Sequence, residues 1–436
     1  MIFFKFLFIV FTLFFLNGCS IKSAFEPHKE IADLKNIPQD ALFYTQNMQE
    51  ANISHIHNNF EKSYFRAWNE DIKEDLNSIM WSFRAFKFTN SYGENLRPLK
   101  QNFFDEMLEN SNFPEYKTLN AKAITTKQTD VRVFPTIKPL FKNPSLAGEG
   151  FPFDYLQNST ICANKPILIS HYSKDKEWAY VFSGFVSGWV KTDNFAILSD
   201  ADAELLQRHQ QIAIVKENIP IYDENHIFLF KSKIGMMFGL LDEDEDSYTI
   251  ATIASEHGSK ALFLKSKIAK SIAYKDRLHI EPKSISLVTN ELYKNNYGWG
   301  GLYEQRDCSS MIRDMFTPFG IWLPRNSYAQ SRIGKVIDMK NMSDEEKIRT
   351  IKQNAIPFQT LLYRKGHIVL YVGTYNDEII VFHNTWGIRT IQNGVEGRHI
   401  VGKAIFSTLK LGKEVENYDT NAELLKNLLS MNTITH

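Results

Sequence analysis

The sequence lacks an excess of charge of either sign, and it has few cysteines. Its 50 Lys and Arg residues balance 50 Asp and Glu residues, so no net attraction directs the chain to nucleic acid. Only 3 cysteines occur in 436 residues. Linkers rich in Gly and Ser or in Pro are also lacking, so we expect the modules of the chain to pack against one another. The hydrophobic fraction of 43% and the charged fraction of 23% are those of a globular protein, and the length suggests about three domains.

A short apolar run opens the chain. Residues 1–17, MIFFKFLFIVFTLFFLN, are too short for a convincing membrane-spanning helix and indicate a signal peptide, which we place over residues 1–19. The ending LNGC resembles a bacterial lipoprotein signal, which implies lipidation of Cys19 and a periplasmic protein. Ser20 after that cysteine resembles the sorting pattern of the outer membrane, with the inner membrane as the alternative. A plain signal peptide followed by an unrelated cysteine is the other interpretation.

Periodicity divides the rest of the chain into four regions and predicts an α+β multidomain protein. Residues 20–125 contain helix-period segments such as LKQNFFDEMLEN and are expected to be helical. Short alternating segments bounded by Gly, Asn, Asp and Ser predict two small all-β modules, over 126–199 and 200–272. Mixed helix and strand periods over 273–436 predict an α+β domain.

One cysteine stands at the start of a predicted helix. In EQRDCSSMIRDMFTPFG, residues 304–320, apolar residues recur at helical spacing from Cys308 onward. Asp307 is a natural N-cap, and Pro318 and Gly320 end the pattern. The unpaired amides and the dipole of a helix start favour a thiolate, whereas the Asp307 carboxylate opposes it. Cys308 is therefore a candidate nucleophile that needs a histidine partner.

Two histidines occupy mirrored positions in a predicted β-hairpin. The segments GHIVLYVG and EIIVFHNTWG alternate like strands, and TYNDE joins them. A hairpin centred on Tyr375 places His367 and His383, each 8 residues away, opposite each other with Cβ atoms about 5 Å apart. This arrangement predicts Cys308 as nucleophile, His367 as general base and His383 as the group that fixes the tautomer of His367.

Other uses of these residues stay open. Cys308, His367 and His383 are good zinc ligands, although a fourth ligand is not evident. A redox role for Cys308 is another interpretation, but no resolving cysteine lies nearby in the sequence. A disulfide between Cys162 and Cys308 suits an oxidising compartment, but Cys162 lies beside an apolar strand-like run, where a buried thiol is the usual expectation.

These motifs resemble a known family. YGWGGLYEQRDCSSMIRDMFTPFGIWLPRNSYAQ, residues 297–330, followed by GHIVLYVG and VFHNTWG, is similar to the NlpC-type (NlpC/P60 superfamily) cysteine peptidases of bacterial cell walls. The β modules, with HYSKDKEWAYV and SGWV, are similar to the bacterial SH3-like domains that accompany this peptidase. The resemblance implies a helical N-terminal stabilising region, two small SH3-like β-barrels and a papain-like α+β peptidase domain.

The resemblance also implies an activity and its residues. The family cuts peptidoglycan stem peptides, typically between D-glutamate and a diamino acid, so the expected partners are stem peptides or muropeptides, with no metal or cofactor. The positions that match its catalytic residues are Cys308, His367 and His383. The positions that match its substrate-binding residues are Tyr297, Asp307 and Ser309.

The implied reaction is acyl transfer from Cys308 to water through a thioester, with Asp307 available to pair with a free N-terminal ammonium of the substrate. In members that prefer such peptides the first SH3-like module closes the pocket, and Glu149 and Asp154 are candidates for its acidic residue. We expect a monomer. Two other functions stay open, a non-catalytic peptidoglycan-binding lipoprotein and a thiol acyltransferase on the same fold.

Overall fold

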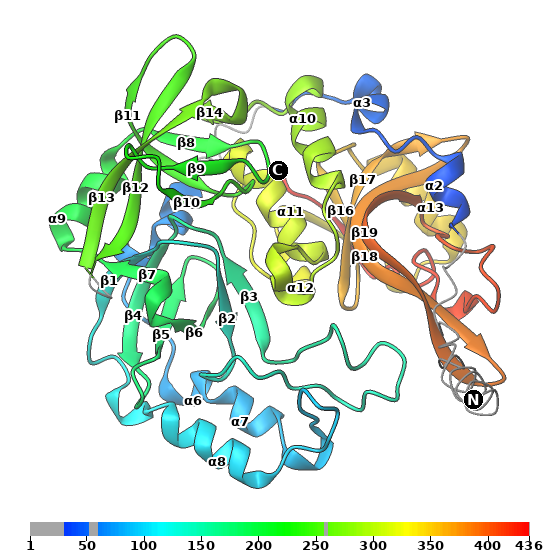
Figure 1. The fold of residues 1–436 in the computed structure, drawn as a ribbon. Helices are drawn as coiled ribbons and strands as arrows, with labels where there is room; N and C mark the ends of the chain where they lie inside the picture. The colour runs from blue at the N-terminus through cyan, green and yellow to red at the C-terminus, as the bar shows by residue number, and fades with distance from the viewer. Residues whose placement is uncertain (1–29, 52–59, 257–259, 436) are drawn as a thin grey trace, which may run out of the picture. The chain divides into compact units, whose positions relative to one another are not determined.

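The computed structural model describes residues 30–51, 60–256 and 260–435 (Figure 1). The signal peptide and Cys19 lie outside the described residues. All elements below belong to one compact unit, Ile31–His436. Within the described ranges, no helix has both the length and the apolar character needed to cross a membrane.

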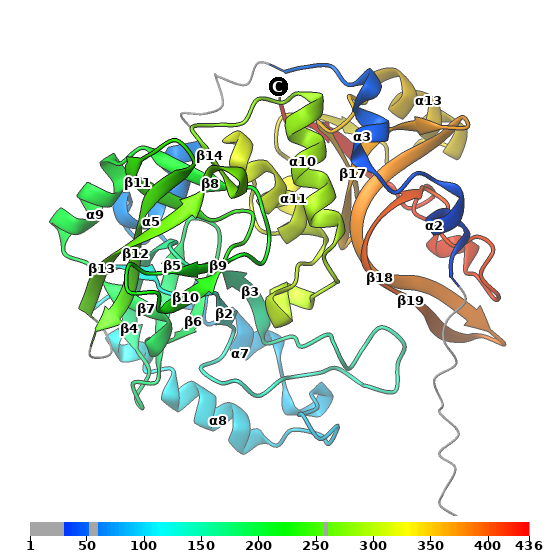
Figure 2. The same ribbon diagram turned by 45° about the horizontal axis from the view of Figure 1, so that its top comes forward.

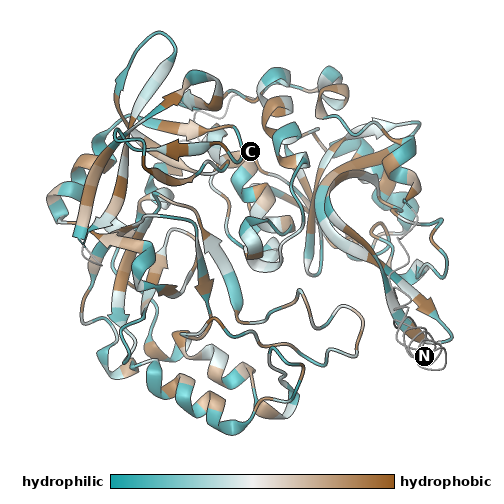
Figure 3. Ribbon diagram, in the orientation of Figure 1, coloured by the Kyte–Doolittle hydropathy of each residue, from teal (hydrophilic) through white to brown (hydrophobic). Residues whose placement is uncertain are grey.

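The N-terminal region forms short helices joined by irregular segments. These are α2 (Ala32–Asn36), α3 (Ala41–Tyr44), α5 (Arg66–Asn69), α6 (Leu76–Ile79), α7 (Trp81–Ala85) and α8 (Gln101–Asn110). The helix-period segments are therefore confirmed as helices, but the region is only partly helical. Its tertiary contacts hold it in place: Trp68 Nε1 donates to the Ala123 carbonyl at 2.9 Å. The longest of these helices, α8, carries hydrophilic and hydrophobic residues together (Figure 3) and buries Phe103 and Phe104.

The two β modules share one sheet of twelve strands among the described residues. The first contributes β1 (Ala121–Thr125), β2 (Thr129–Arg132), β3 (Gln157–Ile161), β4 (Pro166–Tyr172), β5 (Trp178–Ser183), β6 (Ser187–Lys191) and β7 (Phe195–Ile197). The second contributes β8 (Gln211–Ile214), β11 (Met237–Glu243), β12 (Ser247–Glu256), β13 (Lys260–Ala269) and β14 (Ala273–Lys275), with β9 (Pro220–Tyr222) and β10 (Phe228–Lys231) as a separate pair.

A helix joins the two modules, and a strand of the second module then pairs with a strand of the first. Helix α9 (Asp200–Arg208) starts at Ser199, which forms a capping box with Asp202. A parallel bridge between Lys260 of β13 and Ile197 of β7 then joins the two modules. They pack directly against each other, as the lack of a flexible linker predicts.

The C-terminal domain places helices on both faces of an antiparallel sheet (Figures 1 and 2). The strand order is β15 (Lys335–Asp338), β20 (Ser430–Thr433), β16 (Thr360–Arg364), β17 (His367–Tyr375), β18 (Glu378–Gln392) and β19 (Val395–Thr408). Its helices are α10 (Pro282–Tyr293), α11 (Cys308–Phe316), α12 (Ser327–Gln330) and α13 (Asp344–Asn354).

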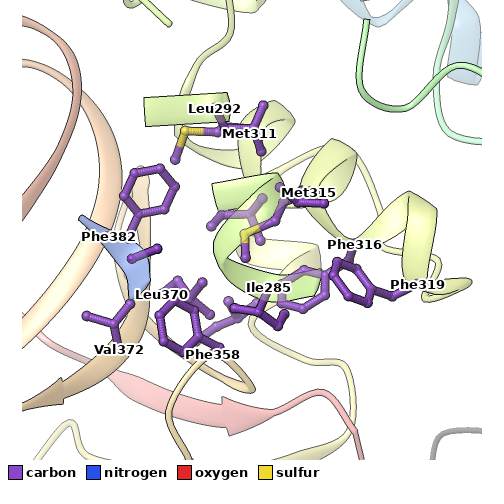
Figure 4. Packing of buried hydrophobic residues seen from close by; sticks show 14 of the residues in the cluster. Ile285, Leu292, Met311, Met315, Phe316, Phe319, Phe358, Leu370, Val372 and Phe382 are labelled. Atoms are coloured by element: carbon purple, nitrogen blue, oxygen red, sulfur yellow. The ribbon is translucent and has the colours of Figure 1, made fainter. Parts of the chain in front are cut away.

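Alternate residues of the central strands explain how both faces are covered. Leu370 and Val372 of β17 and Phe382 of β18 pack with Met311 and Met315 of α11 (Figure 4). The intervening residues pack on the other side with Ile351 of α13. Helix α11 is buried along its whole length, so the residue at its first turn is held against the sheet.

Candidate active site

The predicted nucleophile stands at the first position of α11. The Asp307 carboxylate accepts from the Ser310 backbone N–H at 2.8 Å, and Ser310 Oγ accepts from the Asp307 N–H at 2.9 Å. This capping box confirms Asp307 as the N-cap and fixes where the helix begins. Cys308 is buried at 8% exposure. The thiol therefore points from a rigid helix start into a largely dry environment.

The two predicted histidine partners are in direct contact. His367 Nε2 lies 2.9 Å from His383 Nδ1, and the ring centroids are 5.1 Å apart. Among the described residues no hydrogen bond joins either ring to Cys308 Sγ. The backbone N–H of Ile368 donates a hydrogen bond to that sulfur, so the backbone next to His367 lies beside the thiol. Since Nε2 of His367 is used by His383, Nδ1 is the nitrogen that remains for Cys308.

The predicted register of the hairpin was wrong. Its turn is Asn376 and Asp377, both with positive φ, so Tyr375 pairs with Glu378 and is not the centre. That register alone would put His367 and His383 on opposite faces of the hairpin.

A β-bulge between Tyr371 and Gly373 shifts the pairing by one residue and returns the two histidines to one face. In the shifted register Leu370 pairs with Phe382, so His367 and His383 are diagonal neighbours. The contact was predicted correctly, but the bulge that makes it was not visible in the sequence.

Burial keeps the thiol and the imidazole neutral. It raises the pKa of Cys308 to about 12, and the adjacent Asp307 carboxylate acts in the same direction. It lowers the pKa of His367 to about 4, and the nearby Arg364 cation adds to this effect. Burial and the Asp307 carboxylate thus outweigh the expected preference of the helix start for a thiolate. In this state a proton must move from Cys308 to His367 as the sulfur attacks.

An arginine that sequence reasoning did not assign organises the predicted substrate-binding residues. Arg325 makes a bidentate pair with Asp307, with Nη2 to Oδ2 at 2.6 Å and Nη1 to Oδ1 at 3.1 Å. The same guanidinium donates to Ser309 Oγ at 2.9 Å and to Ser159 Oγ, on β3, at 2.6 Å. Arg325 stood in the LPRNS motif, but nothing local in the sequence identified its partners. It ties the helix start to the first β module.

Tyr297 begins an aromatic wall beside the thiol. Burial raises the pKa of its phenol well above the ordinary value, and the Asp307 carboxylate acts in the same direction, so the hydroxyl stays protonated as a donor. Tyr297 packs against Trp386 at 5.9 Å, and Trp386 packs against Phe153 of the first β module at 5.9 Å. The wall therefore has contributions from two domains.

The two acidic candidates of the first β module already have partners. Asp154 is buried, forms an ion pair with Arg132 at 2.7 Å and accepts from two backbone N–H groups, so its role is structural. Glu149 accepts from the Tyr155 hydroxyl at 2.9 Å.

A backbone contact also holds the turn before Cys308 against this module. The Asp154 backbone carbonyl accepts from Trp299 Nε1 at 2.9 Å.

Both cysteines in the described part of the chain, Cys162 and Cys308, are free thiols, so no disulfide joins them. The same part of the chain contains no group of three or more His, Cys, Asp or Glu side chains that could hold a metal ion.

A cysteine at a buried helix start, packed on a sheet that carries a histidine pair, has the layout of a papain-like peptidase domain. Residues 294–403 match the NlpC/P60 family, and residues 7–116 match its N-terminal stabilising domain. The β modules match an SH3 domain of SH3b1 type over 139–191 and one of SH3b2 type over 199–245. The C-terminal domain belongs to the NlpC/P60 family, and the family predicted from the motifs is confirmed.

A solved structure shares this architecture. An NlpC/P60 endopeptidase from Photobacterium damselae subsp. piscicida is 23% identical with a TM-score of 0.80, covering 92% of this chain and 98% of its own. An NlpC/P60 family protein from Bacillus cereus ATCC 10987 is 15% identical with a TM-score of 0.46, covering 64% and 83%. No curated protein matches the chain. The family supports a cell-wall peptidase, and its SH3 domains fit peptidoglycan binding.

Proposed function

We propose that this protein is a cysteine endopeptidase that cleaves the γ-D-glutamyl bond to the diamino acid of peptidoglycan stem peptides or muropeptides. The observation that carries the proposal is the 2.9 Å contact between His367 and His383 beside the helix-start thiol of Cys308. An imidazole held in this way can accept the proton of a neutral thiol as the sulfur attacks.

The proposed reaction has two steps. The Cys308 proton passes to Nδ1 of His367 while Sγ bonds to the γ-glutamyl carbonyl carbon, and the same proton then leaves on the amine of the diamino acid. Water attacks the resulting thioester, gives one proton to His367, and the proton returns to the departing thiolate. The Cys308 backbone N–H and the Tyr297 hydroxyl are the proposed donors to the oxyanion. No step calls for a metal or cofactor.

Asp307 is the proposed partner of a free N-terminal ammonium on the substrate. Its Oδ1 already accepts from Ser309, Ser310 and Arg325, whereas Oδ2 accepts from Arg325 and keeps a free lone pair. The ordered Arg325 pair lets Asp307 stay ionised despite burial, because the charge of Arg325 and its hydrogen bonds hold the pKa of Asp307 below its ordinary value. Ser309 completes the proposed subsite.

We also propose that the mature protein is a monomer anchored to the periplasmic face of the outer membrane by a lipid on Cys19. The sequence LNGCS supports this placement. Fractionation that finds the protein only in the inner membrane contradicts the sorting part of the proposal.

The test uses purified protein with L-Ala-γ-D-Glu-diaminopimelate, free or N-acetylated, and follows release of the diamino acid by mass spectrometry. Cleavage of the free peptide alone, abolished by Cys308→Ala, is the expected result. Cleavage of both forms would remove the role given to Asp307.

Two control arms separate the alternatives. Transfer of the dipeptide to an added amine in preference to water would indicate an acyltransferase. Failure to cleave either peptide or intact sacculi, with retained binding to sacculi, would indicate a wall-binding protein and overturn the proposal.

A further inference from the structure

A buried serine extends the histidine pair. Ser407, on β19, has its Oγ 2.8 Å from Nε2 of His383. The hydroxyl itself donates to the backbone carbonyl of Thr408 at 3.0 Å. Ser407 and His383 are 0% and 2% exposed, so solvent does not compete for these bonds. A chain of hydrogen bonds therefore runs from His367 through His383 and Ser407 to a main-chain carbonyl.

The bond from Ser407 to this carbonyl gives the chain a direction. A carbonyl oxygen only accepts, so while Ser407 donates its single hydroxyl proton to Thr408, its Oγ is an acceptor towards His383. Nε2 of His383 must then carry a proton, which makes Nδ1 of the neutral ring an acceptor. His367 satisfies that acceptor by donating from Nε2, and its own Nδ1 keeps a lone pair.

We propose that Ser407 is a positioning residue that selects the base-competent tautomer of His367 through His383. The proposal rests on the proposed function in one respect: in the proposed reaction this tautomer accepts the Cys308 proton at Nδ1 of His367. With the opposite polarity Nδ1 of His367 would already hold the proton of the neutral ring, and it would have no lone pair with which to accept the Cys308 proton.

The charge state of His383 makes this choice of tautomer necessary. Burial and the adjacent His367 hold the pKa of His383 well below its ordinary value, so the ring has one proton for two nitrogens. When His367 accepts the Cys308 proton, its Nε2–H remains bonded to His383, and His383 remains neutral with its own Nε2–H on Ser407. One proton moves from sulfur to nitrogen, and none is lost to solvent.

The test is the protonation pattern of the two rings, measured by NMR of the full chain labelled with ¹⁵N-histidine. His367→Gln and His383→Gln assign the signals among the 12 histidines. We expect both rings to carry the proton on Nε2 near neutral pH. In Ser407→Ala, His383 loses its acceptor, so both rings should move to mixed tautomers, and kcat/KM should fall about tenfold or more.

Two further variants separate positioning from simple packing. Ser407→Thr keeps a hydroxyl and should keep the wild-type pattern. Ser170→Ala removes a similarly buried serine that lies 3.0 Å from a ring nitrogen of His171, in the first SH3-like domain, and should leave His367 and His383 unchanged.

Wild-type protein with the proton of His383 on Nδ1 would overturn the proposal, even if the Ser407 variants do not fold. Unchanged ring signals in a folded Ser407→Ala variant would overturn it as well. The measurement needs no substrate, so the expected pattern in a protein that cleaves no peptide would reject the proposed function and leave the role of Ser407 standing.

Discussion

The guanidinium of Arg306 donates to both carboxylate oxygens of Glu217, at 2.9 and 3.0 Å. Arg306 lies two residues before Cys308, and Glu217 belongs to the second SH3-like domain. Both side chains are buried, and Arg306 also contacts Asp314 of α11 at 2.8 Å. The second SH3-like domain is thus joined to the start and the body of the helix that carries the thiol.

Replacement of Glu217 by Gln is expected to destabilise the protein strongly. It leaves the buried Arg306 without its bidentate partner, and loss of one member of a buried ion pair costs roughly 3–5 kcal/mol. Urea denaturation measures the change. Glu204→Gln is the control, because Glu204 pairs with Arg208 at 3.1 Å on the surface and its loss should cost under about 1 kcal/mol. Equal effects of the two substitutions would contradict this account of Arg306.

Replacement of Gly301 by Ala is expected to disturb the turn before Cys308. Gly301 has φ of +91°, and a Cβ there would collide with the Thr160 side chain of the first SH3-like domain. Gly394→Ala is the matched control, since Gly394 has φ of +79° but no atom lies within 4 Å of the place that a Cβ would take. The control should lose about 1 kcal/mol from backbone strain alone. Gly301→Ala should lose clearly more in the same denaturation experiment, together with peptidase activity.

Asp307→Asn is expected to make the Cys308 thiol more reactive. The carboxylate contributes to the raised pKa of Cys308, so its removal lowers that pKa and increases the thiolate fraction near pH 8. A fall of one unit in the pKa gives about tenfold more thiolate, and a roughly threefold faster reaction with iodoacetamide because a less basic thiolate is a weaker nucleophile. Asp307→Glu keeps the charge and serves as control, and Cys308→Ala reports any reaction at Cys162. Slower alkylation of the Asn variant would show that another effect of Asp307 dominates.

The protein is expected to lose stability as the pH falls from about 6.5 to about 4. His367 has a pKa of about 4 when folded against an ordinary value of 6.5, so the unfolded chain binds more protons in this window. The shift corresponds to at most about 3 kcal/mol, fully present above pH 6.5. His383 and His171, whose pKa values are also lowered by burial, act in the same direction.

His367→Gln removes one of these groups and should flatten the dependence of unfolding free energy on pH. Denaturant titrations of both proteins at pH 7 and pH 5 make the comparison. A wild-type protein that is equally stable at both values would be inconsistent with a neutral His367 whose pKa is lowered in the folded state.

The amino-acid sequence by itself determined the local features of the site. Asp307 as N-cap, the helix from Cys308 and its end before Gly320 follow from short-range hydrogen bonding and apolar spacing, and the structure has them where the sequence predicts. The alternation of GHIVLYVG and EIIVFHNTWG likewise predicted the strands that carry the two histidines. The motifs around Cys308 were also sufficient to predict the family.

Only the tertiary structure decided which groups complete the site. Arg325 meets Ser159 across 166 residues, and Arg306 meets Glu217 across 89, through packing between domains that no local pattern encodes. The histidine contact depends on a bulge that no period in the sequence marks. The protonation of Cys308 follows from burial. Removing a thiolate from water costs more free energy than its interaction with the helix dipole provides.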